Sequence, residues 1–346
     1  MWVVYPNANG GMNMQKAQSQ WLFLASMSVL GAPQVVAAQD EVTADQVVSA
    51  VEGVFGVTPG ERRNHTKGVC ARGTFVGSPA AAAYSRSALF SGKSVPVVAR
   101  FSVAGGNPKV PDTAKNPRGM ALEFKLPGGH LQHMTMLNTP IFGAMQPRTF
   151  LDQMTAMKPD PATGKPDPEK VKAFKATHPD NLAQADFLAT NNPPASFATS
   201  AYFGIHTFKF VGRKSKTTLV RWRFVPQDGE KRLTDDELKS APANFLEQTL
   251  IDRTRQGPVR WEMMVALGEA GDPEDNPTLA WPETRKQIKA GTLTISAAMP
   301  QKGAACEKIN FDPLVMADGI APTNDPILLF RSPAYAVSFA KRSGGL

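Results

Sequence analysis

The chain has 346 residues, of which 42% are hydrophobic and 20% charged, which is enough apolar material for the core of one large domain or two ordinary ones. This composition excludes intrinsic disorder, collagen and coiled coil. The net charge is +8, yet no dense run of Lys and Arg with interleaved aromatic residues is present, so we expect no nucleic-acid partner.

The N-terminal segment has the character of an export signal. Residues 21–38 read WLFLASMSVLGAPQVVAA, an apolar stretch that is broken at Gly31 and Pro33 and ends in small residues, as a cleavage site requires. The stretch is too short and too interrupted to span a bilayer, so we expect no membrane association. From this pattern we expect a signal peptide at residues 1–38, a domain at residues 39–346, and a periplasmic or secreted location. The alternative for the N-terminal segment is a buried helix.

A short amphipathic helix is predicted at the start of that domain. Thr43 and Gln46 have the spacing of a capping box, which satisfies free backbone amides at a helix start. Valines and Phe55 recur at helical spacing, and Gly56 ends the pattern.

β-like runs dominate the sequence that follows. Eight segments are rich in β-branched and aromatic residues, at 69–75, 95–103, 120–125, 134–137, 201–211, 217–225, 261–267 and 293–296. About eight strands suggest a closed barrel or a sandwich. The fifth and sixth runs are separated by a glycine-containing polar loop at residues 212–216, which predicts a hairpin.

Helices are predicted between these strands and at the C-terminus. The internal ones cover residues 149–157, 169–177 and 243–254. The C-terminal segment 326–342 is apolar at helical spacing, with Asp325 as N-cap and Pro326 in the first turn. Pro333 falls inside it, where a helical N–H is lost, so we expect a kink there.

The two cysteines, Cys70 and Cys306, are far apart in the sequence. Their spacing fits neither a zinc site nor a disulfide-dense scaffold, although the two could form one disulfide.

The five histidines differ in their settings. His130 and His133 have the spacing H-x-x-H, but two glycines precede them and no acidic residue stands beside them, which favours a turn and a strand over a ligand pair. His178 is interpreted as a loop residue, and His206, inside a strand-like run, as structural. His65 stands where a turn rises into a strand, and no nucleophile elbow, P-loop or dinucleotide fingerprint competes with it.

The segment around His65 resembles the distal-histidine signature of the haem catalases. It reads ERRNHTKGVCARGTF, with an Arg three residues before the His and a Gly three after it. Further motifs follow in the family's order, at Ala99-Arg100-Phe101-Ser102, Asp112-Thr113, Asn116-Pro117-Arg118-Gly119, Asn138–Phe142, His206–Lys209, Phe311–Pro313 and Arg331–Tyr335. The resemblance covers roughly residues 54–342 and points to the short, exported catalase-related peroxidases. It implies an α+β fold, a catalase-like antiparallel eight-stranded β-barrel surrounded by α-helices, with a buried haem b.

By this resemblance His65 is the distal acid and base. Cleavage of a peroxide O–O bond needs a proton to move from one oxygen to the other, and an imidazole with an ordinary pKa of about 6.5 can accept and return it near neutral pH. Ser102 hydrogen-bonds the other ring nitrogen and fixes its tautomer. Tyr335 is the proximal iron ligand, bound as phenolate. Arg331, one helical turn earlier, is the cation that favours the charged phenolate.

The resemblance also assigns the residues that hold the haem. Arg62, Arg100 and Arg342 align with the arginines that receive the propionates, for which a guanidinium has the matching bidentate geometry. Phe142 and Phe150 line the haem face and its access channel.

Three departures from the family's pattern concern the peroxide pocket. The family has two consecutive asparagines before Thr-Pro, and the first supplies an amide that hydrogen-bonds peroxide; this chain has Leu137-Asn138. We therefore take Asn138 as the candidate for that amide; the alternative is that the amide is missing. Asn64 replaces the Val that is usual beside the distal His, and Pro333 lies close to Tyr335. We infer weakened catalase activity and retained peroxidase activity.

The function implied is that of a haem peroxidase, a monomer or homodimer that reduces hydrogen peroxide or organic hydroperoxides with small organic electron donors. Two alternatives remain at this stage. A fatty-acid hydroperoxide isomerase of the allene oxide synthase kind shares this fold and the His, Tyr and Arg set. A non-enzymatic haem or lipid carrier would use the barrel as a container.

Overall fold

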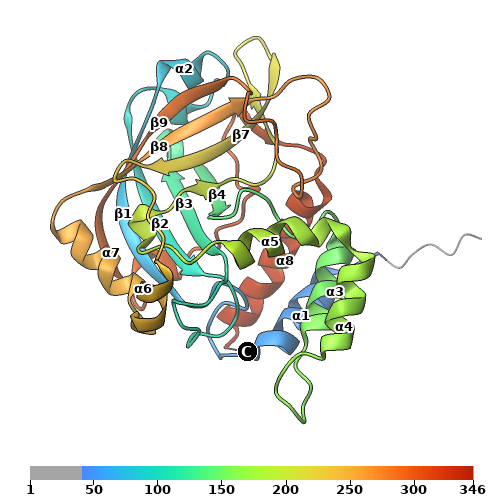
Figure 1. Cartoon of the computed structure of the whole chain (residues 1–346). Coiled ribbons are helices and arrows are strands. Elements are labelled where there is room, and N and C mark those ends of the chain that lie inside the picture. Colours follow the sequence, from blue (N-terminus) through green and yellow to red (C-terminus); the bar gives the residue numbers. More distant parts are fainter. Residues whose placement is uncertain (1–40, 346) are drawn as a thin grey trace, which may run out of the picture. The chain divides into compact units, whose positions relative to one another are not determined.

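The computed structural model of the protein describes residues 41–345, so the expected signal peptide at residues 1–38 lies outside the described residues. Eight antiparallel strands form a closed ring in which each strand pairs with the next, and β7 pairs with β8 to complete it (Figure 1). In ring order these are β1 (Gly68–Gly77), β2 (Ser94–Val103), β3 (Arg118–Lys125), β4 (Leu131–Leu137), β5 (Tyr202–Phe203), β7 (Thr217–Pro226), β8 (Val259–Leu267) and β9 (Gln287–Pro300). The predicted eight-stranded barrel is confirmed.

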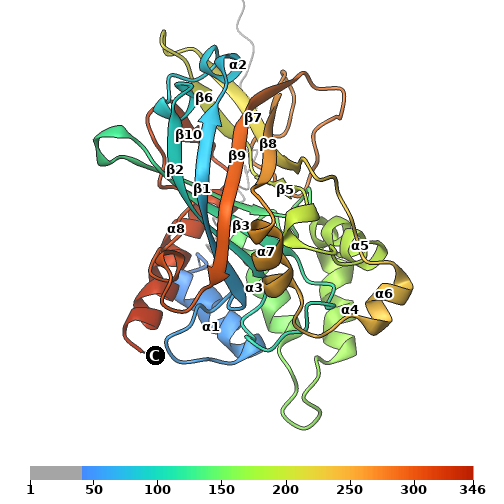
Figure 2. The same ribbon diagram turned by 90° about the vertical axis from the view of Figure 1, so that its left-hand side faces the viewer.

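Two short strands extend the sheet beyond the ring. β6 (Phe208–Val211) pairs with β7, and β10 (Ile320–Pro322) pairs with β6. The hairpin predicted between residues 201–211 and 217–225 is present as β6 and β7, with Val211 opposite Thr217. Figure 2 shows β1 and β9 side by side, so the barrel closes through segments from opposite parts of the chain.

One predicted strand is interrupted, and the interruption matters for the site. The run 201–211 divides into β5 and β6 because Ile205 has a φ of 53° and His206 N–H donates to Gly204 O at 2.6 Å. A side chain at Gly204 would meet the Trp222 indole nitrogen at 2.6 Å, so only glycine fits this close approach. The break turns His206 out of the regular strand.

Alternate strand residues fill the barrel with large apolar side chains. Phe75 packs edge-on against Phe124 with ring centres 5.4 Å apart, and Phe101 stacks on Trp261 at 5.6 Å. The buried Trp261 indole donates to Ser200 O at 3.1 Å, so its polar atom is satisfied. The barrel interior is therefore a packed core, and the site lies outside it.

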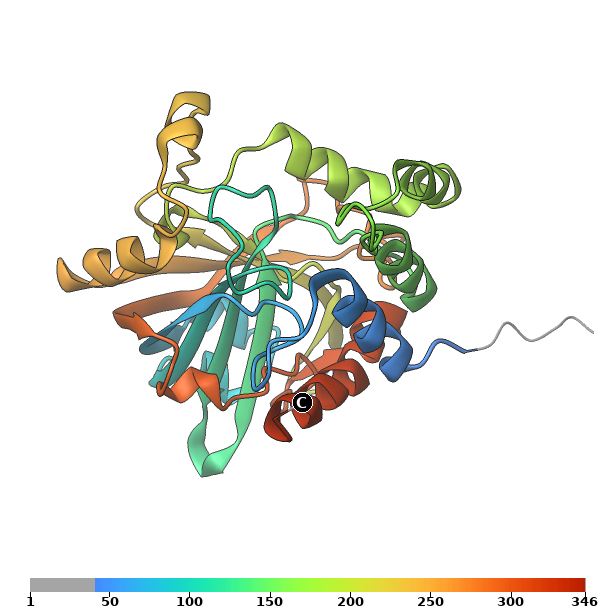
Figure 3. The ribbon, with the colours of Figure 1, turned by 90° about the horizontal axis from the view of Figure 1, so that it is seen from below.

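Helices surround the barrel as expected. They are α1 (Ala44–Phe55), α2 (Pro79–Ala82), α3 (Pro147–Met157), α4 (Pro168–Thr177), α5 (Leu182–Thr190), α6 (Asp235–Ser240), α7 (Leu246–Arg255) and α8 (Pro326–Ser343), with short 3-10 turns at Ala88–Phe90, Pro127–Gly129, Pro179–Asn181, Phe197–Thr199 and Ala305–Glu307. α1 packs against α3 and α8, and Figure 3 shows α1 in blue beside α8 in red. The helices α2, α5 and α6 and the strand β10 were not predicted from the sequence.

The predicted helix ends agree with the structure. Thr43 and Gln46 form the capping box of α1, and Asp325 accepts two backbone amides at the start of α8. α8 runs from Pro326 to Ser343 with Pro333 inside it, so this proline does not end the helix.

Cys70 of β1 and Cys306 form a disulfide with their Cα atoms 5.6 Å apart, which answers the question that the sequence left open. Phe311 packs with this disulfide in a small apolar cluster outside the barrel core. The bridge fixes residues 305–309 to the barrel wall. Within residues 41–345, no helix has both the length and the apolar character that a membrane span requires.

Candidate active site

A cavity lies between the outer side of the barrel and the helices α1, α3 and α8, and nearly all the predicted site residues border it. They come from the loop before β1, from β2, from the segment after β4, and from α3 and α8: His65, Arg62, Arg100, Ser102, Phe142, Phe150, Arg331, Tyr335 and Arg342. Only Asn138, among the predicted residues, is absent from its lining. The tertiary structure therefore brings into one place residues that span most of the chain.

His65 is held in an uncommon backbone conformation. Its φ is 55°, in the left-handed region that costs a non-glycine residue on the order of 1 kcal/mol or more. The side chain of Asn64 compensates, because its Oδ1 accepts His65 N–H at 2.8 Å and Gly105 N–H at 2.7 Å. Asn64, which departs from the family's pattern, thus supports the turn that presents the imidazole.

The imidazole ring is fixed on one edge and open on the other. Nδ1 lies 2.9 Å from Ser102 Oγ, as the resemblance implies, and no described residue hydrogen-bonds Nε2. Gly119 lies directly behind: a Cβ there would be 2.9 Å from Ser102 Oγ and 3.0 Å from the His65 ring. Burial lowers the pKa of His65 to about 3, and the neighbouring Arg100, Arg331 and Arg62 add to this effect. The ring is therefore neutral at ordinary pH.

Two of the predicted haem arginines also support the loop that carries His65. Arg100 is buried and donates through Nη2 to His65 O at 2.7 Å and to Thr66 O at 3.0 Å. Arg62 donates to the carbonyl oxygens of Cys306 at 3.0 Å and Ile309 at 2.8 Å, which the disulfide holds in place. Burial lowers the pKa of Arg62 to about 10, with the positive charge of Arg342 adding to the effect.

Arg342 of α8 has a buried nitrogen that lacks a hydrogen-bond partner among the described residues. This nitrogen is Nη1, while the guanidinium lies 4.8 Å from the ring centre of Phe339. Burial lowers the pKa of Arg342, which reports the cost of holding this charge away from water. A guanidinium with a buried, unpaired nitrogen at the cavity wall fits a carboxylate from a bound group.

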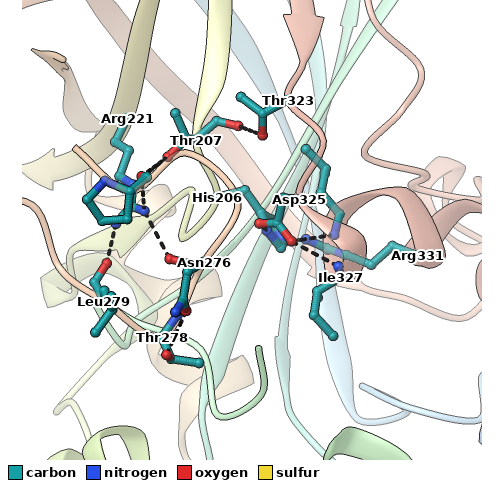
Figure 4. A network of polar contacts seen from close by, with 12 residues as sticks. His206, Thr207, Arg221, Asn276, Thr278, Leu279, Thr323, Asp325, Ile327 and Arg331 are labelled. Carbon is teal, nitrogen blue, oxygen red and sulfur yellow. Dashed lines mark hydrogen bonds and ion pairs between the residues drawn. The ribbon is translucent and has the colours of Figure 1, made fainter. Parts of the chain in front are cut away.

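On the α8 side of the cavity, Tyr335 stands in a chain of polar contacts. Arg331 Nη2 donates to Tyr335 Oη at 2.7 Å, one helical turn away. Arg331 Nη1 lies 3.0 Å from His206 Nε2, and His206 Nδ1 lies 2.6 Å from Asp325 Oδ2 (Figure 4). Asp325 also caps α8, because its Oδ1 accepts Ile327 N–H at 2.9 Å. The pair predicted on α8 is confirmed as a contact, and it is embedded in a larger network.

The contacts of His206 define its tautomer. A guanidinium can only donate, so Nε2 is the acceptor and the proton resides on Nδ1, which donates to Asp325. Burial lowers the pKa of His206 against the opposing effect of Asp325, which agrees with a neutral ring. His206 is buried with both ring nitrogens bonded, as expected of a structural histidine, but it lies between β5 and β6 and not inside a strand. It also contacts Arg331 at the cavity.

Apolar side chains form the remaining walls. Phe142 and Phe150 stack with ring centres 5.9 Å apart, and α1 contributes Val47, Val48 and Val51, all of them buried. The cavity therefore combines apolar faces with a few polar groups, the usual composition of a site for an organic cofactor.

Asn138 does not border the main cavity, so the prediction that its amide acts in the peroxide pocket is wrong. Its Oδ1 accepts the backbone N–H of Arg118 at 2.7 Å, and its backbone N–H donates to Arg118 O at 2.8 Å. It borders a separate small pocket, whereas Leu137 borders the main cavity. The β3–β4 pairing thus uses the amide, and an apolar side chain occupies the position from which the family's amide would act.

Of the two histidines with the H-x-x-H spacing, His133 has an acidic partner. His133 is buried on β4 and its Nε2 lies 3.1 Å from Glu123 of β3, a carboxylate partner that the sequence analysis missed. No cluster of three or more potential metal-ligating side chains is present between residues 41 and 345.

The donor set fits the haem that the resemblance implies. Tyr335 offers an oxygen ligand with a cation bonded to it, and His65 presents a neutral ring to the same cavity. Arg342 offers an unpaired donor for a propionate, and the walls between these groups are apolar. A tyrosine oxygen, an apolar cavity and a cation for a carboxylate suit an iron porphyrin that is ligated by tyrosine.

Comparisons with known proteins agree with this arrangement. The family described as Catalase matches residues 57–345. A catalase-related peroxidase from Synechococcus elongatus is 61% identical over 330 residues, which cover 94% of this chain and 97% of the relative. A catalase-related peroxidase from Mycolicibacterium paratuberculosis is 33% identical over 303 residues, covering 87% of this chain and 95% of the relative.

Solved structures show the same fold. Catalase A from Saccharomyces cerevisiae superposes with a TM-score of 0.76 at 22% identity, covering 82% of this chain and 62% of that one. A fungal catalase gives the same TM-score and identity, and the match covers 83% of this chain and 60% of that one. The chain thus spans about three-fifths of the length of these catalases.

Proposed function

The chain belongs to the catalase family, and on that premise we propose that it is a haem peroxidase that reduces hydrogen peroxide or organic hydroperoxides with small organic electron donors. The observation that carries the proposal is the cavity that contains both a neutral His65 and the Tyr335–Arg331 pair. The relatives of nearly equal length are named catalase-related peroxidases, which supports a peroxidase more than either alternative.

Six side chains would hold haem b in this cavity. Tyr335 would ligate the iron, and Arg342, with Arg62 and Arg100 nearby, would receive the propionates. Phe142 and Phe150 would pack on the porphyrin or along its access path. When bound, the haem supplies the redox-active iron that exchanges electrons with the peroxide and the donor.

His65 moves the proton that peroxide cleavage requires. Because its pKa is lowered to about 3, Nε2 is an unprotonated base at neutral pH when Nδ1–H donates to Ser102 Oγ. It can take the proton from one peroxide oxygen and return it to the oxygen that leaves as water or alcohol. Ser102 and Gly119 prevent the ring from turning, so the open edge stays toward the cavity.

Weak catalase activity follows from the residue at position 137. Fast disproportionation needs a second peroxide to be held and oriented, and an apolar Leu137 offers it no hydrogen bond where the family has an amide. Reduction by an organic donor does not depend on that amide. We propose that peroxidase turnover exceeds catalase turnover in this protein.

Export to the periplasm or the exterior is also proposed. The Cys70–Cys306 disulfide supports it, because such bonds persist in oxidising compartments and are rare in the cytosol. The signal-like segment at residues 1–38 is the second support. We propose a monomer or homodimer as the working form.

The experiment is a comparison of wild-type protein with His65→Ala, using haem spectra, donor oxidation and oxygen evolution. We expect a Soret band in both proteins and a loss of peroxide-dependent donor oxidation by roughly two to four orders of magnitude in the variant. His178→Ala, outside the cavity, is the matched control and should behave as wild type. Wild-type protein without a Soret band, or a fully active His65→Ala variant, would contradict the proposal.

The same preparations separate the alternatives. An isomerase would convert a fatty-acid hydroperoxide without consuming any electron donor. A carrier would bind haem or lipid and show no difference between wild type and His65→Ala. A peroxidase consumes donor in proportion to the peroxide reduced.

A further inference from the structure

Thr135 of β4 makes a contact that the proposed function does not use. Arg331 Nη2 donates to Thr135 Oγ1 at 2.5 Å as well as to Tyr335 Oη at 2.7 Å. Thr135 is half-buried and borders the cavity. The Thr135 hydroxyl and the Tyr335 phenol therefore both accept a hydrogen bond from Nη2 of Arg331.

The partners of Arg331 are unusual for a partly buried cation. Its side-chain acceptors are His206, Thr135 and Tyr335, and it forms no ion pair with a carboxylate of residues 41–345. Arg63, by contrast, is paired directly with Glu52. Neutral acceptors hold a guanidinium without cancelling its charge, so the charge remains available to the phenol oxygen.

The three acceptors come from three different elements. His206 lies between β5 and β6, Thr135 on β4, and Tyr335 on α8. A planar guanidinium with acceptors on both terminal nitrogens has little freedom to rotate. If Thr135 lost its hydroxyl, Nη2 would keep Tyr335 as its single acceptor, and the guanidinium would be held against the phenol oxygen by two contacts and not three. A threonine on a strand is itself stiff at χ1, so the hydroxyl is well fixed.

We propose that Thr135 is a positioning residue for the proximal ligand. Its hydroxyl holds Arg331 against the phenol oxygen of Tyr335, so that the cation withdraws electron density from the phenolate and less of it reaches the iron. The inference rests on the proposed function, because it requires Tyr335 to be the haem ligand.

The test compares Thr135→Val and Thr135→Ser with wild-type holoprotein. Val has nearly the shape of Thr without the hydroxyl, whereas Ser keeps the hydroxyl. We expect Thr135→Val to have a more negative iron midpoint potential, since a less restrained Arg331 leaves more charge on the phenolate. Its ferric high-spin EPR signal should differ from that of wild type, since Tyr335 would donate more charge to the iron. Thr135→Ser should restore most of both properties.

Thr218→Val on β7 is the matched control, because Thr218 is also half-buried on a strand and lies outside the cavity. It should leave the potential and the EPR signal unchanged, which separates positioning from a general effect of losing a hydroxyl. A potential for Thr135→Val that equals or exceeds that of wild type overturns the inference. If wild type itself lacks the spectrum of phenolate-ligated haem, the proposed function fails first, so the two failures are distinguishable.

Discussion

Glu52 of α1 and Lys341 of α8 form an ion pair, with Oε2 and Nζ 2.8 Å apart. The other oxygen of Glu52 lies 2.6 Å from Arg63 Nε, next to the residues that present His65. One carboxylate thus fastens three elements at the edge of the cavity. Because α1 supplies three valines to the lining, these two ion pairs of Glu52 keep one wall of the cavity in place. We call the two ion pairs the Glu52 clamp.

Replacing Glu52 by Gln should destabilise the fold by about 1 to 2 kcal/mol at neutral pH, since charge-assisted hydrogen bonds to two cations are weakened. Burial would raise the pKa of Glu52, but the hydrogen bonds from Lys341 and Arg63 outweigh it and lower the pKa below 4.5. This stabilisation is therefore present above pH 4.5 and lost as the pH falls through the lower folded value.

Urea unfolding of wild type and Glu52→Gln as a function of pH checks this. The difference in the free energy of unfolding should shrink on acidification below pH 4.5. Glu262→Gln removes a more exposed ion pair with Lys289 and should cost clearly less, as surface pairs do. An equal loss in both variants would contradict the clamp.

The pH profile of peroxide cleavage should reflect the buried state of His65. Burial and three arginines lower its pKa to about 3, so the base form persists well below the ordinary histidine range. We expect kcat/KM for peroxide to stay level on acidification and to fall only near pH 3. Steady-state rates over this pH range test the prediction. A fall in kcat/KM centred near pH 6.5 would show that His65 is not held neutral by its surroundings.

Removing the hydroxyl of Ser102 should slow peroxide cleavage without loss of haem. Without the 2.9 Å contact at Nδ1, neither the tautomer nor the ring orientation of His65 is fixed. We expect a fall in the cleavage rate of roughly 10- to 100-fold, the scale seen when a supporting hydrogen bond is lost. Ser85→Ala is the control, since Ser85 is also buried but bonds Gly319 O away from the cavity. Equal rates for wild type and Ser102→Ala would remove Ser102 from the site.

Arg342→Met should have opposite effects on the apoprotein and the holoprotein. In the apoprotein the change removes a buried nitrogen that has no partner, so stability should be unchanged or increased. In the holoprotein it removes a donor for a propionate, so haem should transfer to apomyoglobin at least about tenfold faster. The exposed Arg255→Met should alter neither quantity. A haem transfer rate equal to that of wild type would exclude Arg342 as a propionate partner.

Leu137→Asn should raise catalase activity by placing an amide at the cavity wall. The expected readout is oxygen evolved from hydrogen peroxide without a donor, which should increase several-fold while donor oxidation changes less. Asn138→Ala should instead cost about 1 to 3 kcal/mol of stability, because it leaves the buried Arg118 N–H unpaired. If Asn138→Ala alone abolished oxygen evolution, the assignment of position 137 would be wrong.

Local sequence was sufficient for most secondary structure. The capping box at Thr43 and the Asp325-Pro326 start of α8 fix helix ends through bonds within four residues, so no tertiary knowledge is needed. Runs rich in β-branched and aromatic residues located the barrel strands. The single run at residues 201–211 hid a break, because the positive φ of Ile205 and the close approach of Gly204 to Trp222 leave no mark in the hydrophobic pattern.

The motifs identified most of the polar side chains at the cavity, but not how they act together. Asn138 was misplaced because its amide serves the β3–β4 pairing, which is decided by strand register and not by the motif. Asp325 was correctly read as a helix cap, and its second oxygen, bonded to His206, was not foreseen.

Neighbouring residues and ordered motifs were enough to predict most helices and strands, the family and the identity of the reactive side chains. The tertiary structure alone decided which groups touch. His206 and Asp325 are 119 residues apart, and Thr135 and Arg331 are 196 apart. Such contacts exist only because the barrel closes and α8 returns to its wall, and no pattern within a short stretch of sequence contains that information.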